Sequence, residues 1–292
     1  MEANIKNLYQ HVAFLTELQP ARNYRNLASL DKAATYIHEQ FSAHDFNVVE
    51  YQPFKVKSGN TYKNISARIE GKSKERIVVG AHYDVWGELP GADDNASAVA
   101  GLLETARLLS NFSKEHRPAY TLEFVAYCLE EPPFFATDEM GSAVHARELH
   151  NNKTPLKLMV CYEMIGYFSD EAGSQGFPHP SLKELYPDKG NFIIVGGHSS
   201  QPAVAQNFAG LMQKACNIPV HPVASQVTDG PVALSDHRSY WKYQFPAVMI
   251  NDTSFLRNPN YHEKTDTIDT LNFEKMAEVV NGVTGALLSM NR

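Results

Sequence analysis

Apolar residues recur with two different spacings along the chain, and the change between them predicts where helices and strands lie. Near the N-terminus the spacing is that of one helical face, and it is carried by Ile5, Leu8, Val12 and Leu15. Pro20 ends this pattern, because proline cannot continue a helix. A second helical face follows over residues 33–41, and Ser29 is its expected N-cap.

Beyond this helical start, the chain alternates between apolar strand-like runs and helix-like segments. We expect strands at 47–56, 61–70, 76–84, 119–130, 156–163, 191–197 and 246–252. We expect helices beginning near residue 95, over 138–150, near 201–215 and over 271–290. This alternation predicts an α/β fold: a single domain over residues 1–292, with a central mixed, mostly parallel sheet flanked by helices.

The segment 167–190 interrupts this alternation. It is rich in glycine and proline and has no clear period. A long irregular segment inside a compact domain often has a function, such as lining a binding site. A passive surface excursion explains the pattern equally well.

Composition and charge narrow the function classes. Of the 292 residues, 43% are hydrophobic and 20% are charged, as in an ordinary folded protein. The formal net charge is −7 and no run of Lys or Arg stands out, so a nucleic-acid partner is not expected. No apolar run is long enough to cross a membrane, so a membrane partner is not expected either.

Two further features bear on compartment and redox state. The first ten residues, MEANIKNLYQ, are polar and show no signal peptide. The protein is therefore expected in the cytoplasm, or exported with its leader removed. The three cysteines are too few and too scattered for a disulfide framework. We expect Cys128 and Cys161, which lie in strand-like runs, to be buried core residues.

Candidate chemistry collects where the expected strands end. In an open α/β sheet, ligands bind outside the carboxyl ends of the strands. Carboxylates and imidazoles are the ligands zinc takes when thiolates are absent. The residues that follow successive strands are His82 and Asp84, Asp94 with Asn95, Glu130 with Glu131, Glu163, and finally His262.

Each of these residues also has an ordinary structural explanation. Asp94 could cap the next helix, Glu130 and Glu131 could form a solvated turn, and His262 could be a surface histidine. Only their joint placement favours a functional site. Motifs of other enzyme classes are absent: the sequence contains no HExxH zinc motif, no GxSxG elbow, no P-loop and no GxGxxG.

Several segments, in this order, resemble one known family. They are GAHYD (80–84), PGADDNASAVAGLLE (90–104), the Glu-Glu pair (130–131), YEMIGY (162–167), SDHRSYW (235–241) and YHEKTDT (261–267). Together they resemble the co-catalytic, two-zinc metallo-aminopeptidase family, which includes bacterial leucyl-type aminopeptidases, glutamate carboxypeptidase and glutaminyl cyclase. The resemblance runs from about Asn64 to the C-terminus.

The resemblance implies a role for each matching residue. The ligands of two zinc ions would be His82, Asp94, Glu131, Glu163 and His262. Asp94 would bridge the ions. One ion would add His82 and Glu163, and the other Glu131 and His262. Many relatives carry aspartate where this chain has Glu163, and glutamate has one more methylene.

Further roles follow from the same resemblance. Glu130 would be the general base, and Asp84 would hold the imidazole of His82. Tyr261 would donate to the developing oxyanion, although packing is nearly as good an explanation. The peptide bond before Asn95 is often cis in this family. Six residues near the ligand segments could line an apolar pocket: Phe134, Phe135, Tyr167, Phe168, Met249 and Phe255.

Three functions remain open. The first is an aminopeptidase, a hydrolase that removes the N-terminal residue from peptides with a free amino terminus. The second is a glutaminyl cyclase-like acyltransferase that forms pyroglutamate; such enzymes usually have tryptophan where this chain has Tyr261. The third is a peptidase-like binding protein without activity, which the complete set of expected ligands opposes. The sequence does not indicate the oligomeric state or the preferred side chain.

Overall fold

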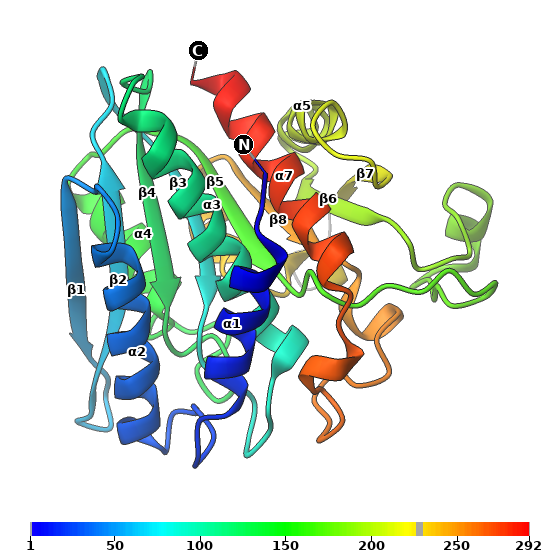
Figure 1. The fold of residues 1–292 in the computed structure, drawn as a ribbon, viewed down its shortest axis with the longest axis horizontal. Coiled ribbons are helices and arrows are strands. Elements are labelled where there is room, and N and C mark those ends of the chain that lie inside the picture. Colours follow the sequence, from blue (N-terminus) through cyan, green and yellow to red (C-terminus); the bar gives the residue numbers. More distant parts are fainter. Residues whose placement is uncertain (1, 226–229, 292) are drawn as a thin grey trace.

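Eight strands form one mixed sheet at the centre of the molecule (Figure 1). The computed structural model describes residues 2–225 and 230–291. The strand order is β1-β2-β4-β3-β5-β8-β6-β7. The strands are β1 (Val48–Lys55), β2 (Thr61–Ile69), β3 (Ser73–His82), β4 (Tyr120–Tyr127), β5 (Leu156–Glu163), β6 (Ile193–His198), β7 (Val220–Ser225) and β8 (Ala247–Asn251).

The middle of the sheet is parallel. β4, β3, β5 and β8 pair in parallel, whereas β2 and β6 run antiparallel to their neighbours in this block. The carboxyl ends of four neighbouring strands therefore open on one edge of the sheet. The expected fold class, an α/β fold with a mixed and mostly parallel sheet, is confirmed.

Helices cover both faces of the sheet, because successive side chains of a buried strand point to opposite faces. Ile77 and Val79 of β3 pack into one apolar cluster, with residues of α1, α2, α3, α5 and α7. Val78 packs into a second cluster, with residues of α4 and α6. The helices are α1 (Ile5–Thr16), α2 (Leu27–Ser42), α3 (Ala98–Ser113), α4 (Gly141–Asn151), α5 (Pro202–Gln213), α6 (His237–Trp241) and α7 (Phe273–Met290).

Two elements were not expected from the sequence. β7 is a short edge strand that contains Pro222. Proline lacks the backbone N–H that pairs with a neighbouring strand, so within sheets it is largely confined to edges. α6 has only five residues, too few to show a helical period. Both cysteines expected in the core, Cys128 and Cys161, are fully buried.

Two helix starts differ from expectation. α2 begins at Leu27, so Ser29 lies inside the helix and is not its cap. Asn26 precedes the helix; its amide nitrogen donates to the carbonyl of Ala21 and to Glu88, and its side chain makes no capping hydrogen bond. α4 begins at Gly141, not at residue 138, because the backbone N–H of Gly141 donates to the carbonyl of Cys128 at 2.7 Å.

No helix within the described ranges is both long and apolar enough to cross a membrane. The segment between β5 and β6 extends from the body of the molecule in Figure 1. It contains one short helical turn, Pro180–Glu184, and is otherwise irregular.

Candidate active site

All five residues predicted as metal ligands come together at the carboxyl edge of the sheet. They form two groups that share Asp94, and the potential ligand atoms of each group all lie within 4.8 Å of one another. His82 and Glu163 are the last residues of β3 and β5. The first group is His82, Asp94 and Glu163, and the second is Asp94, Glu131 and His262.

The carboxylate of Asp94 has one oxygen in each group. Its Oδ1 lies 3.4 Å from Nε2 of His82, and its Oδ2 lies 3.1 Å from Nε2 of His262. Nε2 of His82 is also 3.3 Å from Oε2 of Glu163. Nε2 of His262 is 3.5 Å from Oε2 of Glu131. Asp94 is thus the only residue common to both groups in the described part of the chain.

Three of these four separations match the spacing of ligands around a tetrahedral zinc ion, and the fourth, 3.1 Å between Asp94 and His262, is slightly shorter. Bonds of about 2.0–2.2 Å place neighbouring ligand atoms roughly 3.3–3.6 Å apart. A charge-assisted hydrogen bond would instead be about 2.7–2.9 Å long. The second carboxylate oxygen of Glu131, Oε1, is buried and has no hydrogen-bond partner. The donor set and this unpaired oxygen both fit a bound cation.

The backbone around Asp94 is held by a second carboxylate that the sequence did not single out. The backbone N–H groups of Asp93 and Asp94 donate to Asp266, at 2.8 and 3.1 Å. The peptide bond between Asp94 and Asn95 is cis, as the resemblance implied. The side-chain oxygen of Asn95 accepts from the backbone N–H of Met164 at 2.9 Å, which joins the Asp94 turn to the residue after Glu163.

Three of the eight non-glycine residues with positive φ in the described part of the chain lie at the same place. Leu129, Met164 and His262 have φ values of 65°, 43° and 57°. Positive φ is uncommon for residues with a side chain and persists where the surroundings hold it. Leu129 directly precedes the Glu pair, Met164 directly follows Glu163, and His262 is itself a candidate ligand. The strained backbone therefore lies at or next to the candidate ligands.

Asp84 organises the neighbouring Glu pair. Its two carboxylate oxygens accept the backbone N–H groups of Glu130 and Glu131, at 3.1 and 3.2 Å. The contact expected between Asp84 and His82 has a different form. The carboxylate is 3.6 Å from Nδ1 of His82, whereas the backbone carbonyl of Asp84 is 3.2 Å away.

The buried carboxylates change each other's acidity. Burial, together with the charge of Glu131, raises the pKa of Glu130 well above its usual value. Burial and Asp94 raise the pKa of Glu131 to about 7. Burial alone would lower the pKa of His262, but Asp94 and Glu131 raise it to about 10. The cluster therefore holds positive charge strongly, which a divalent cation can supply in place of protons.

Glu163 reaches the first group despite its extra methylene. Besides its position near His82, its Oε2 accepts from the hydroxyl of Ser235 at 2.5 Å. Ser235, Asp236 and His237 form no triad, because Nε2 of His237 is 2.7 Å from the carbonyl of Val232. The SDHRSYW segment thus supplies a hydrogen bond to a candidate ligand.

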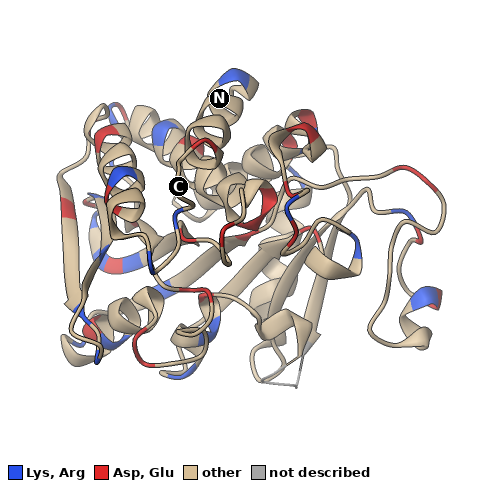
Figure 2. Cartoon of the chain, turned by 90° about the horizontal axis from the view of Figure 1, so that it is seen from below, with Lys and Arg blue, Asp and Glu red and all other residues tan. Residues whose placement is uncertain are grey.

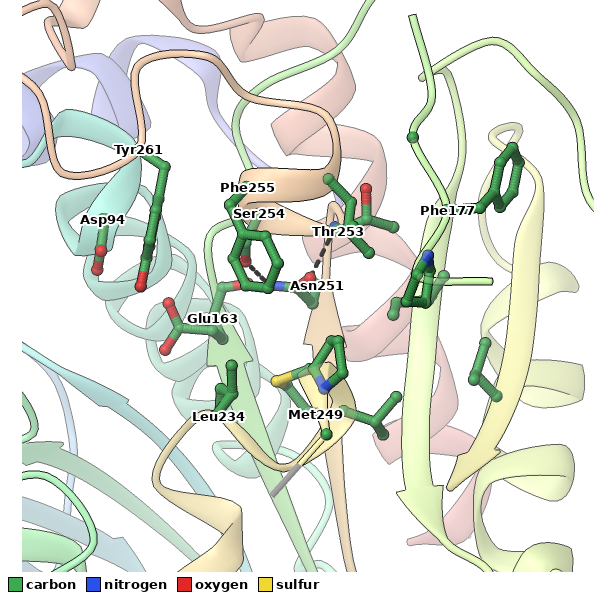
Figure 3. A pocket seen from close by; sticks show the side chains of 18 of the residues that line it. Asp94, Glu163, Phe177, Leu234, Met249, Asn251, Thr253, Ser254, Phe255 and Tyr261 are labelled. Atoms are coloured by element: carbon green, nitrogen blue, oxygen red, sulfur yellow. Dashed lines mark hydrogen bonds between the residues drawn. The ribbon is translucent and has the colours of Figure 1, made fainter. Parts of the chain in front are cut away.

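Two aromatic residues stack on the imidazole of His262. Tyr261 lies 3.9 Å away and Trp86 lies 5.4 Å away, measured between ring centroids, with interplanar angles of 15° and 12°. The hydroxyl of Tyr261 points toward the space beside Asp94 and Glu163 in Figure 3. Burial raises the pKa of Tyr261, so its proton is retained at neutral pH.

A buried arginine, Arg22, lies near this cluster, and no sequence pattern predicted its position. The guanidinium of Arg22 donates to the carbonyls of Tyr83, Pro90 and Gly91, at 2.9, 2.6 and 2.6 Å. It also donates to Leu15 at 3.0 Å. Arg22 therefore fixes the loop between β3 and the Asp94 turn by hydrogen bonds to its backbone carbonyls.

The candidate ligands open onto a pocket of about 450 Å³. In Figure 3 Asp94, Glu163 and Tyr261 lie at one end, Phe177 lies at the far end, and Leu234 and Met249 lie between. The pocket is mostly apolar away from the ligands. Strands β6, β7 and β8 contribute to it and contain no Asp, Glu, Lys or Arg, as Figure 2 shows.

The aromatic residues expected at the pocket divide into two sets. Phe135, Met249 and Phe255 line it. Phe134, Tyr167 and Phe168 do not, and Phe134 packs against Tyr24 and Tyr62 instead. The irregular segment 167–190 lines the pocket with Gln175, Gly176, Phe177, Pro178, Leu182 and Tyr186. That segment is therefore not a passive excursion.

Comparisons with known proteins show which proteins the chain resembles. The family model described as Peptidase family M28 matches residues 64–286. The uncharacterised protein YfbL of Escherichia coli (strain K12) is 40% identical over 289 residues, which cover 96% of this chain and 87% of YfbL. Leucine aminopeptidase 1 of Uncinocarpus reesii is 27% identical over 295 residues, covering 94% of this chain. The match spans 65% of that fungal protein, slightly under two-thirds of its length.

Solved structures share the fold. The Legionella pneumophila LapA aminopeptidase superimposes with a TM-score of 0.77 at 21% identity, covering 99% of this chain and 73% of that one. A glutaminyl cyclase of Bacteroides thetaiotaomicron superimposes with a TM-score of 0.72 at 17% identity, covering 100% of this chain and 99% of that one. At these identities the likeness concerns the fold alone.

Proposed function

This chain belongs to peptidase family M28, and from this premise we propose that it is a two-zinc aminopeptidase. It would remove the N-terminal residue from peptides with a free amino terminus. The observation that carries the proposal is the position of Asp94, whose two carboxylate oxygens belong to separate groups of candidate ligands. We also propose that residues 1–292 act as one catalytic domain, since all the strands described join one sheet.

The residues that would hold the zinc ions are those predicted from the sequence. His82, Asp94 and Glu163 would bind one ion, and Asp94, Glu131 and His262 the other. When bound, the ions would lower the pKa of a water molecule and polarise the scissile carbonyl. The names of the fungal and bacterial aminopeptidases support this reaction class for a chain of the same fold.

Glu130 would act as the general base. Its carboxylate lies 3.8 Å from Nε2 of His82, beside the candidate ligands but outside both groups. Burial raises its pKa, which suits a group that accepts a proton and then passes it to the leaving amine. Tyr261, which keeps its own proton, would donate a hydrogen bond to the oxygen that becomes negative in the transition state.

The pocket indicates which N-terminal residues would bind. The acidic end suits the ammonium group of a free amino terminus. The apolar end, with Leu234, Met249 and Phe177 in Figure 3, suits a large apolar side chain. We propose that leucyl and phenylalanyl substrates are cleaved faster than alanyl substrates.

One experiment tests the proposal. Zinc is quantified after mild dialysis, and hydrolysis of leucyl-, phenylalanyl- and alanyl-nitroanilides is compared with hydrolysis of their N-acetyl forms. About two equivalents of zinc are expected for a two-metal site. Only free-amine substrates should be cleaved. Equal cleavage of acetylated and free substrates would refute the aminopeptidase assignment.

The same experiment separates the competing activity. The glutaminyl cyclase fold superimposes over the whole of this chain, so an N-terminal glutaminyl peptide is included. Release of ammonia with pyroglutamate formation, about one zinc and no shortened peptide would establish the cyclase. A preparation that binds zinc and catalyses neither reaction would indicate a binding protein.

A further inference from the structure

The wall of the pocket far from the candidate ligands is held by a second buried arginine, Arg257. Only 6% of Arg257 is exposed. It is the last residue of the segment 253–257 that follows β8, and it contacts residues 167–192, which extend the irregular segment 167–190 to the start of β6 and which we call the excursion. Both segments contribute residues to the pocket lining.

Every hydrogen bond of the Arg257 side chain reaches the excursion. Its Nε donates to the side-chain oxygen of Gln175 at 2.9 Å. Its Nη1 donates to the backbone carbonyls of Phe192 and Tyr167, at 2.9 and 3.4 Å. The guanidinium also lies over the rings of Phe192 and Phe168, at 4.6 and 5.6 Å from the centroids. A single cation thus holds both ends of the excursion.

Gln175 connects Arg257 to residues that line the pocket. Its amide nitrogen donates to the hydroxyl of Thr253 at 2.9 Å. The next residue, Gly176, donates its backbone N–H to the carbonyl of Leu256 at 2.7 Å. Gln175, Gly176, Thr253 and Leu256 all line the pocket. Arg257 therefore acts on the lining through Gln175 and does not itself line the pocket.

Close packing shows that little space is left around the cation. A Cβ added to Gly190 would lie 2.7 Å from Cδ and Nε of Arg257. Asp252 supports the same junction, because its carboxylate accepts the backbone N–H groups of Tyr167 and Ser254, both at 2.9 Å. The excursion and the 253–257 segment are thereby fixed to each other at several points.

We propose that Arg257 is a positioning residue that determines substrate preference: by tying the excursion to the 253–257 segment, it builds the pocket wall that receives a large apolar N-terminal side chain. The inference rests on the proposed aminopeptidase function. None of the hydrogen bonds of Arg257 reaches a candidate metal ligand. Loss of Arg257 should therefore change the preference among substrates, and neither zinc content nor the chemical step.

The test compares Arg257→Met, which keeps the aliphatic stem, with Arg257→Lys and with wild type. The ratio of kcat/KM for leucyl and phenylalanyl substrates to that for the alanyl substrate is measured. In Arg257→Met this ratio should fall roughly 10- to 100-fold while the alanyl value stays within about threefold, because only the apolar contacts are lost. Arg257→Lys should lie between, since it keeps the charge but not the planar fork.

Arg107→Met is the matched control for general destabilisation. Arg107 also pairs with a fully buried carboxylate, Glu104, but lies on α3 and outside the pocket lining. Its substrate ratio should stay at the wild-type value. Gly190→Ala, which displaces Arg257 sterically, and Gln175→Met, which cuts the link from the other side, should both lower the ratio. If Arg257→Met fails to fold, the substrate ratios of these two variants test the role of Arg257 instead.

A second readout does not depend on turnover. Binding of the amino acids L-leucine and L-alanine is measured by calorimetry, and Arg257→Met should lose affinity for leucine only. An unchanged ratio, or an equal fall for all substrates with loss of zinc, would overturn the role of Arg257. A wild-type enzyme inactive on every free-amine substrate would instead refute the proposed function, so the two failures are distinguishable.

Discussion

The two ends of the pocket are built from different parts of the fold. At the acidic end, His82 and Glu163 end neighbouring parallel strands, and Asp84 and Asp266 hold the turns that carry the other candidate ligands. At the apolar end, the lining comes largely from the excursion and from segments 230–234 and 253–256. The proposed ligands thus gather at the carboxyl edge of the sheet, whereas the residues proposed to receive the substrate side chain lie largely on connecting segments.

A buried arginine supports each end in a different way. Arg22 donates to backbone carbonyls of the loop before the Asp94 turn, and the negative charges of Asp266 and Asp94 lie nearby. Arg257 joins two segments that lie on opposite sides of one junction. Disturbing the first should affect metal binding, and disturbing the second should affect preference. Substitutions at each end test whether the two ends are separable in this way.

The largest effect is expected for Glu130→Gln. Loss of the general base should lower kcat by roughly 10²–10⁴ for every substrate alike. Zinc content and the ratio of leucyl to alanyl hydrolysis should stay unchanged, because Glu130 lies outside both ligand groups. Steady-state kinetics and metal analysis on the same preparation provide the check. Glu131→Gln is the comparison, and it should weaken zinc binding. Loss of zinc from the Glu130 variant alone would reverse the two roles.

A smaller effect is expected for Ser235→Ala. Its hydroxyl donates to Glu163 at 2.5 Å, so its loss frees a candidate ligand from its orientation. Zinc affinity should fall roughly 10- to 100-fold, as is typical when a partner of a metal ligand is removed. Competition with a chelator of known affinity measures the change. Ser200→Ala is the control, because Ser200 is exposed and hydrogen-bonds His198 outside the pocket. Unchanged zinc affinity in Ser235→Ala would contradict the interpretation.

The apolar end should respond only in substrate preference. Phe177→Ala removes a side chain from the far end of the pocket (Figure 3). The value of kcat/KM for a phenylalanyl substrate should fall roughly tenfold while the alanyl value stays constant. Leu185→Ala is the matched control on the same excursion, since Leu185 is 72% exposed and does not line the pocket. Equal losses with both substrates would mean that the two ends are not separable.

The smallest effect on activity is expected for His11, which lies on α1 away from both ends. Burial lowers the pKa of His11 to about 4, from 6.5 in the unfolded chain. The unfolded chain binds a proton first, so this residue costs stability as the pH falls from 6.5 to 4. The cost reaches about 3 kcal/mol at most. His11→Gln should flatten the dependence of unfolding free energy on pH, measured by urea titration, without altering substrate preference.

The sequence predicted the acidic end far better than the apolar end. His82, Glu130 and Glu163 follow or end apolar strands, and residues at strand ends converge whenever those strands are parallel neighbours. Residues 167–190, which make up most of the excursion, show no hydrophobic period that could predict their structure. Its role depends on contacts such as that between Gln175 and Arg257, which are 82 residues apart. The roles assigned to the ligands, Glu130 and Tyr261 remain predictions until metal and kinetics are measured.

By itself, the sequence determined the fold class, the family and the set of residues available for chemistry. The hydrophobic period and the order of the motifs can be read from the sequence without knowledge of the folded chain. The resemblance implied that Asp94 bridges two ions, and the tertiary structure places one of its oxygens in each ligand group. It alone also showed that Ser235 orients Glu163, and that Arg22 and Arg257 are buried rather than solvated. These facts depend on pairings between distant segments, and a hydrogen bond leaves no mark on the spacing of the residues that form it.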